Sequence, residues 1–89
     1  MKAIKAKISG RVQGVAFRYY CKLQADELNI FGTVQNLNDG TVELKAQGNE
    51  HQIRLLLIWC KSGSPAAQVT QVETIDFPLF NPKDFSILR

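Results

Sequence analysis

The sequence has few metal ligands and no long apolar segment. It contains one histidine, His51, and two cysteines, Cys21 and Cys60, which lack the CxxC spacing. We therefore expect no metal site, and both cysteines are most simply small core residues. A disulfide between them stays open, because it requires α-carbons within about 7 Å, which the sequence does not show. The longest apolar run, residues 55–60, is too short to cross a bilayer, and the N-terminus lacks an apolar leader. A cytoplasmic protein without membrane contacts is expected.

The sequence also lacks a large excess of either charge. Eleven basic and eight acidic residues give a net charge of +3 over 89 residues, and they are scattered along the chain. This mild excess favours small anionic ligands, but nucleic-acid-binding proteins usually carry denser basic stripes. We expect no nucleic-acid partner.

Hydrophobic periodicity and turn residues predict two helices and four or five strands in one domain, residues 1–89. The predicted elements are strand 2–9, helix 16–28, strands 31–37 and 41–47, a helix from the cap Asn49 to the break at Gly63, strand 69–77 and a short closing strand 84–88. This βαββαβ order predicts an α+β fold, an antiparallel four- to five-stranded sheet with both helices on one face. Right-handed crossovers place the third strand between the first two, which are then parallel.

The segment GRVQGVAFR, residues 10–18, joins the first strand to the first helix. Gly10 and Gly14 permit backbone angles that turn successive N–H groups toward one point, and the start of the helix adds its own free N–H groups. Arg18 faces the positive end of the helix dipole, so an anion is expected beside it. The predicted phosphate-binding loop consists of Gln13, Gly14, Val15, Ala16, Phe17 and Arg18.

Asn36 lies near the end of the second strand. Because the first two strands are predicted to be parallel, their ends meet at one edge of the sheet, separated by two strand spacings or roughly 10 Å. The amide of Asn36 can donate and accept hydrogen bonds at once, which suits it to hold a water molecule over a bound anion.

These two segments resemble the motifs of the acylphosphatase family. GRVQGVAFR matches the first motif, and GTVQNLNDGTVE, residues 32–43, resembles the second; Trp59, the break at residues 63–65 and residues 85–87 also resemble family features. The resemblance implies a ferredoxin-like α/β sandwich that hydrolyses acyl phosphates to a carboxylate and inorganic phosphate without a cofactor. It also implies two catalytic residues, Arg18 binding phosphate and Asn36 orienting the attacking water.

Three positions depart from the family pattern. Thr33 occupies a position where tryptophan is common, Gln35 one where a basic residue is common, and Ala16 a variable position of the loop. These differences affect substrate contacts or packing more than the two chemical positions.

The chemistry needs few groups, because an acyl phosphate is a mixed anhydride whose carboxylate leaves without a strong acid. Charge stabilisation and alignment are the main requirements of phosphoryl transfer. No general base is apparent, so we expect the substrate phosphate to take the proton of the water. The expected partners are a small acyl phosphate and inorganic phosphate, which is both product and competitive ligand, and we expect a monomer.

Two other functions remain open from the sequence. One is a weakly active acylphosphatase-like domain that regulates or assists larger enzymes. The other is an RNA-recognition domain, because such domains share this order of elements. However, the first and third predicted strands, residues 2–9 and 41–47, contain no aromatic residue on which a base could stack.

Overall fold

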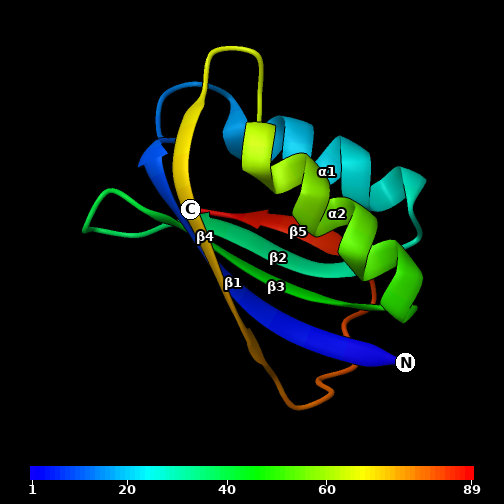
Figure 1. The fold of residues 1–89 in the computed structure, drawn as a ribbon. Coiled ribbons are helices and arrows are strands. Elements are labelled where there is room, and N and C mark those ends of the chain that lie inside the picture. Colours follow the sequence, from blue (N-terminus) through cyan, green and yellow to red (C-terminus); the bar gives the residue numbers. More distant parts are fainter.

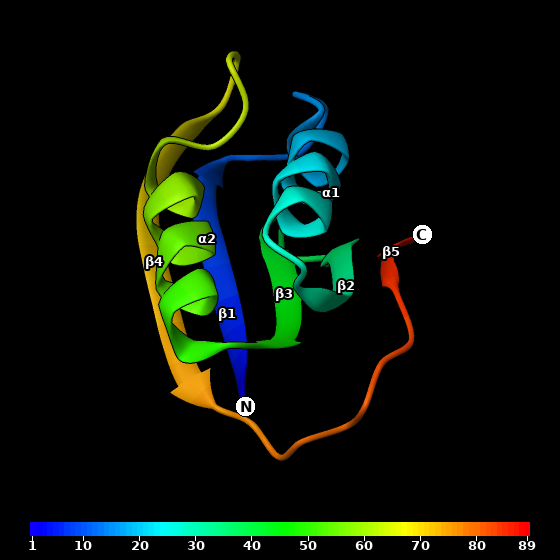
Figure 2. The same cartoon turned by 90° about the vertical axis from the view of Figure 1, so that its right-hand side faces the viewer.

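The computed structural model describes residues 1–89 as a five-stranded sheet with two helices packed on one face (Figures 1 and 2). All predicted elements are confirmed, with ends that shift by one or two residues. The elements are β1 (Lys2–Arg11), α1 (Phe17–Glu27), β2 (Phe31–Asn36), β3 (Val42–Gly48), α2 (Glu50–Ser62), β4 (Gln68–Asp76) and β5 (Phe85–Leu88).

The strand order is β4-β1-β3-β2-β5. β3 pairs antiparallel with both β1 and β2, so β1 and β2 are parallel, as predicted. The expectation of an entirely antiparallel sheet is wrong at one edge, because β5 pairs parallel with β2. The reason is the connection after β4, which crosses from one edge of the sheet to the other and returns the chain in the direction of β2 (Figure 2).

The core lies between the sheet and the helices. The buried helix residues recur at helical spacing, and the alternating strand residues beneath them complete the cluster. The buried residues of the helices are Phe17, Cys21 and Ala25 of α1 and Ile53, Leu56 and Cys60 of α2. Fully burying a large apolar side chain of this kind contributes about 1.5–3 kcal/mol to folding.

Cys21 and Cys60 are free thiols with no exposed surface, as expected for core residues. The neighbouring Cys60 thiol is the largest cause that raises the pKa of Cys21 well above its usual value, and burial raises it further. Cys21 therefore stays protonated, and both residues serve as packing groups between α1 and α2.

Gln47 fixes the connection that carries the chain to β5. Its side chain is buried, and its Oε1 accepts from the backbone N–H groups of Phe80 at 2.8 Å and Asn81 at 3.1 Å. Its Nε2 donates to Oδ1 of Asn81 at 3.2 Å. These bonds hold a segment without regular structure, on the path from β4 to β5, against β3.

Candidate active site

The β1–α1 loop, residues 12–16, lies at the end of the sheet where β1 and β2 finish (Figure 1). Gly14 has φ +73°, as expected from the sequence, and Ala16 has φ +61°. These two left-handed residues turn the chain sharply into α1. None of the backbone N–H groups of residues 13–19 has a backbone or side-chain acceptor within the protein. The loop and the first turn of α1 therefore present a set of free donors.

Gly10 has a different role from the one expected of it. Its φ is +118°, and a Cβ there would collide with the carbonyl oxygen of Gln68 on β4. Gly10 lies at the register shift between β1 and β4. It therefore permits the close approach of two strands and does not belong to the loop that carries the free donors.

Side chains hold the loop without using its free donors. Nε2 of Gln13 donates to the carbonyl oxygens of Leu37 at 2.8 Å and Thr41 at 2.9 Å, which ties the loop to the β2–β3 turn. On the other side, the buried Ser64 hydroxyl donates to the carbonyl of Val15 at 2.7 Å. Neither contact could be predicted from the sequence, because the bonded residues lie far apart along the chain.

Phe17 fixes the start of α1 in the core. It is 1% exposed, and its ring lies 5.2 Å from that of Trp59, between centroids. An aromatic pair at this separation adds about 0.5–1.5 kcal/mol beyond its buried area. Core packing of Phe17 therefore fixes the start of α1, while the backbone N–H groups at this end of the helix remain free to bind a ligand.

Arg18 lies on α1 beside β5. Its Nη1 donates to the carbonyl oxygen of Leu88 at 3.0 Å. A guanidinium has five N–H donors in a planar fork, so this bond orients the group and leaves other donors for a ligand. The end of β5 thus holds Arg18 in position.

Lys22, one turn further along α1, contacts the beginning of the same strand. Its Nζ donates to the carbonyl oxygen of Phe85 at 2.7 Å and to Asp26 at 3.1 Å. α1 has Lys22 early and Asp26 late, the reverse of the order that the helix dipole favours, and the contact of Lys22 with β5 explains this order. Lys22 gives no indication of a bound anion.

Asn36 is the last residue of β2 and lies in one row across the sheet with Val42 of β3 and Ile8 of β1. The predicted meeting of the ends of β1 and β2 at one edge is confirmed. Oδ1 of Asn36 is buried and accepts no hydrogen bond. Buried polar atoms are almost always paired, so this acceptor is available for a ligand or a water.

A hollow of about 180 Å³ brings these groups together. It is lined by Val12, Gly14, Ala16, Phe17, Arg18, Tyr19, Asn36 and Ile87. Gly14, Ala16, Phe17, Arg18 and Asn36 were predicted for the site from the sequence, whereas Gln13 and Val15 support the loop from outside this lining. Sequence reasoning did not assign Val12, Tyr19 or Ile87 to the site. The place of Ile87 depends on the parallel pairing of β5.

The β2–β3 turn beside the site is closed by its own hydrogen bonds. Asp39 accepts from the hydroxyl of Thr41 at 2.6 Å and from its backbone N–H at 3.0 Å. The Thr41 hydroxyl is the largest cause that lowers the pKa of Asp39, and the Thr41 N–H and Lys7 lower it further. This turn is the fixed support to which Gln13 ties the loop.

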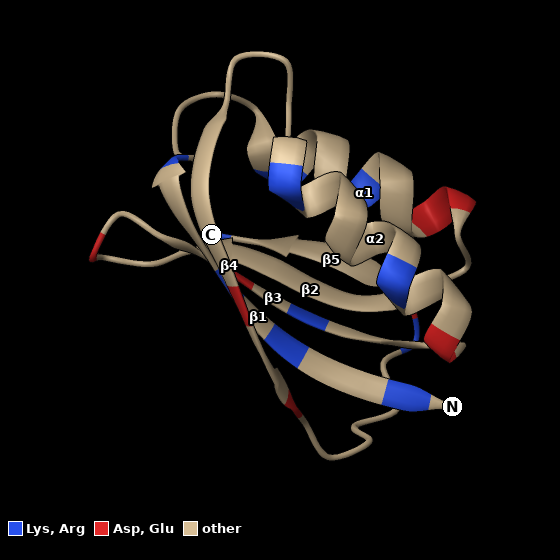
Figure 3. Ribbon diagram, in the orientation of Figure 1, with Lys and Arg blue, Asp and Glu red and all other residues tan.

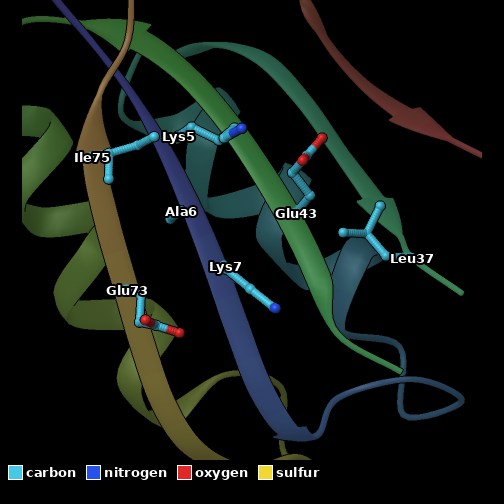
Figure 4. Close-up of a pocket in the computed structure, with 7 residues that line it drawn as sticks. All are labelled: Lys5, Ala6, Lys7, Leu37, Glu43, Glu73 and Ile75. Atoms are coloured by element: carbon cyan, nitrogen blue, oxygen red, sulfur yellow. The ribbon is translucent and has the colours of Figure 1, made fainter. Parts of the chain in front are cut away.

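A second hollow, of about 280 Å³, lies on the face of the sheet away from the helices (Figure 4). It is lined by Lys5, Ala6, Lys7, Leu37, Glu43, Glu73 and Ile75. Lys7 lies opposite Glu43 of β3 and Glu73 of β4 in the strand register. Lys7 therefore has an opposite charge on each side, whereas Lys5 lies opposite the like-charged Lys45. Figure 3 shows both basic and acidic residues on these strands.

The departures from the family pattern on β2 belong to this open face. Thr33 pairs with Lys45 and Gln35 with Glu43, and both alternate with the buried Val34. Neither residue lines the hollow that contains Arg18 and Asn36. In the structure, no group of three or more His, Cys, Asp or Glu side chains could hold a metal ion, and neither helix is long and apolar enough to span a membrane.

Comparisons with known proteins agree with this geometry. The acylphosphatase family model matches residues 4–87. The acylphosphatase of Acaryochloris marina is 44% identical over 86 residues, covering 97% of this chain and 92% of its own, and that of Methylococcus capsulatus is 39% identical over 90 residues, covering 100% and 98%. The crystal structure of the acylphosphatase from Bacillus subtilis superposes over the whole of both chains with a TM-score of 0.97 at 36% identity. With this sequence, fold and site, the chain belongs to the acylphosphatase family.

Proposed function

We propose that this chain hydrolyses acyl phosphates in the hollow between the β1–α1 loop, Arg18 and Asn36. The observation that carries the proposal is the buried, unpartnered Oδ1 of Asn36 beside Arg18 and the free loop donors. An acceptor, a cation and several N–H donors around one hollow match the needs of phosphoryl transfer to water.

The phosphoryl group lies against the N–H groups of residues 13–19. Backbone donors at a helix start favour an anion through both hydrogen bonding and the helix dipole. Arg18 donates to the phosphoryl oxygens with the part of its fork that Leu88 does not use. Two independent sources of positive potential thus stabilise the charge on the transferred group.

The attacking water donates a hydrogen bond to Oδ1 of Asn36. This bond fixes the direction of the water's lone pair toward phosphorus. As the new P–O bond forms, the bond between phosphorus and the carboxylate oxygen breaks, and the carboxylate leaves with the electron pair. A phosphoryl oxygen takes the proton of the water, so the products are a carboxylate and inorganic phosphate.

All residues of the proposed site come from one chain, so a monomer contains a complete site. A regulatory role or RNA binding draws no support from the similarities above. The adjacent strands β1 and β3 also carry no aromatic residue for base stacking.

The direct test is phosphate release from benzoyl phosphate by the purified chain. We expect turnover that inorganic phosphate inhibits competitively and that persists with a chelator. Phosphate should also raise the melting temperature, because a ligand that binds only the folded state stabilises it. The proposal fails if benzoyl phosphate is not hydrolysed, or if phosphate inhibits turnover without raising the melting temperature at the same concentrations.

A further inference from the structure

Two loops that are far apart in the sequence meet at the end of the sheet that carries the proposed phosphoryl site. The β1–α1 loop, residues 12–16, belongs to the site, and the α2–β4 loop, residues 63–67, lies at the same end (Figure 1). Gly63 packs so closely on the ring of Phe17 that a Cβ there would lie 2.9 Å from Cε2. The Ser64 hydroxyl donates to the carbonyl oxygen of Val15 at 2.7 Å. The α2–β4 loop can therefore act on the conformation of the β1–α1 loop.

Ser64 is fixed by its own turn. Its residue is 2% exposed, and it is followed by Pro65, whose ring restricts φ to the value that the second position of such a turn requires. The backbone N–H of Ala67 closes the turn on the carbonyl oxygen of Ser64 at 2.9 Å. The position of the hydroxyl is thus set within the α2–β4 loop, independently of the site that it contacts.

The bond from Ser64 determines which way the next N–H group points. In a planar trans peptide, the carbonyl of Val15 and the N–H of Ala16 belong to one unit and point in opposite directions. A hydroxyl that holds the carbonyl on the buried side therefore directs the N–H of Ala16 to the other side. Ala16 is exposed and lines the hollow of about 180 Å³, and its N–H has no acceptor within the protein. This N–H is one of the free donors of the proposed site.

The local preference of the backbone opposes this orientation. Ala16 has φ +61°, in the left-handed region, which alanine disfavours by roughly five- to thirtyfold in population. Rotating the peptide between Val15 and Ala16 by half a turn would bring this φ into the negative range. The same rotation would point the N–H of Ala16 away from the hollow. The conformation that suits the chain and the one that suits an anion thus differ at this one peptide.

We propose that Ser64 is a positioning residue that keeps the peptide between Val15 and Ala16 in its anion-binding orientation. The inference rests on the proposed function, in which the loop N–H groups hold the phosphoryl group. Ser64 does not line the hollow and acts only through the carbonyl of Val15. Without its hydroxyl, the unliganded loop populates the rotated peptide, and the apparent affinity for an anion falls with the fraction of competent molecules. A bound anion then holds the peptide itself, so the chemical step is unaffected.

The first experiment separates binding from turnover. Ser64→Ala should raise the dissociation constant of inorganic phosphate and the KM of benzoyl phosphate about fivefold, and change kcat less than about twofold. Ser64→Cys has a similar volume and a weaker donor, so its values should lie between those of Ser64→Ala and the wild type. Ser62→Ala is the matched control, because that hydroxyl also donates to a backbone carbonyl, of Trp59 at 3.2 Å, but away from the β1–α1 loop. The control should keep the wild-type values, and an equal loss in it overturns the inference.

The second experiment repeats Ser64→Ala in the Ala16→Gly background. Glycine has no left-handed penalty, so the rotated peptide loses its advantage there. Removing the hydroxyl should then weaken phosphate binding only about twofold, against about fivefold when Ala16 is present. An equal loss in both backgrounds would show that Ser64 supports the loop generally and would overturn the inference.

A nuclear Overhauser measurement observes the peptide without turnover. The N–H and Hα protons of Ala16 are close at φ +61° and farther apart at negative φ, so their cross-peak should be strong in the wild type. It should weaken in unliganded Ser64→Ala and recover on saturation with phosphate. An unchanged cross-peak with unchanged phosphate affinity refutes the role of Ser64. Failure of the proposed function is a separate result, because the wild type would then not hydrolyse benzoyl phosphate, whereas the cross-peak would still report on Ser64.

Discussion

The β1–α1 loop and the β2–β3 turn lie at the same end of the sheet but use their backbone groups in opposite ways. The turn is closed by its own bonds, from Thr41 to Asp39 and from the Leu37 N–H to the Thr41 carbonyl at 2.9 Å. The loop and helix start, residues 13–19, leave their N–H groups without protein acceptors. The β2–β3 turn thus acts as a support, and residues 13–19 present free N–H donors to a ligand.

Gln13 is the link between the two segments. It belongs to the loop, but its side chain bonds two carbonyls of the turn. A loop whose donors are free would be mobile on its own, because nothing within it restricts its backbone. The comparison therefore teaches that the ordering of the donors comes from neighbouring elements. The following variants test this division, from the largest expected effect to the smallest.

Arg18→Gln should abolish phosphate binding and lower kcat/KM by at least about 10³, because the phosphoryl charge loses its charged partner. The measurements are steady-state kinetics and the rise in melting temperature on adding phosphate. Lys22→Gln is the matched control, since it removes the other contact between α1 and β5. That control should keep the phosphate response. A folded Arg18→Gln protein with a normal response would contradict the assigned role.

Asn36→Ala should lower kcat by roughly 10²–10³ and change phosphate affinity only a few-fold, because Asn36 acts on the water and not on the phosphoryl group. The kinetic constants and the inhibition constant of phosphate measure the two effects separately. Gln35→Ala, on the same strand but on the open face, should retain activity. Circular dichroism must first confirm that both variants fold. Loss of phosphate affinity as severe as in Arg18→Gln would refute the proposed role.

Gln13→Ala should remove the link between the loop and the turn. Two carbonyls lose their donor, so the free energy of unfolding should fall by about 2 kcal/mol, and kcat should fall about tenfold as the loop and Asn36 lose their fixed relation. Denaturant unfolding and kinetics measure these changes. Gln71→Ala, which changes an exposed glutamine on β4, should do neither. If Gln13→Ala destabilised the chain without changing kcat, the link would be structural only.

Ala16→Gly should have the smallest effect, a gain in stability of at most about 1.5 kcal/mol. Alanine at φ +61° has a left-handed penalty of roughly 1–2 kcal/mol, of which the greater freedom of glycine in the unfolded chain offsets about 0.5–1 kcal/mol. Thermal unfolding measures the gain. Gly14→Ala tests the same left-handed penalty in the opposite direction. A Cβ at Gly14 meets no atom within 4 Å, so the penalty of alanine at φ +73° is the effect that remains. It should lower the melting temperature, and a rise would show that the left-handed penalty is absent.

The sequence alone determined the elements and the core faces, and it predicted the two proposed chemical positions. Local rules were sufficient for this, because glycine, the Asp-Gly turn and helical spacing act over a few residues. Asn36 could be placed at the same edge as the loop because right-handed crossovers constrain the first three strands. Motif resemblance then supplied the proposed roles of Arg18 and Asn36.

Only the tertiary structure decided which groups hold and surround the site. Gln47 holds the segment without regular structure that leads to β5. The parallel pairing of β5 with β2 then brings the Leu88 carbonyl to Arg18 and places Ile87 in the lining of the hollow. The bond from Ser64 to Val15 joins residues 49 positions apart. Such contacts have no periodic pattern in the sequence, because they arise when separately formed elements pack together.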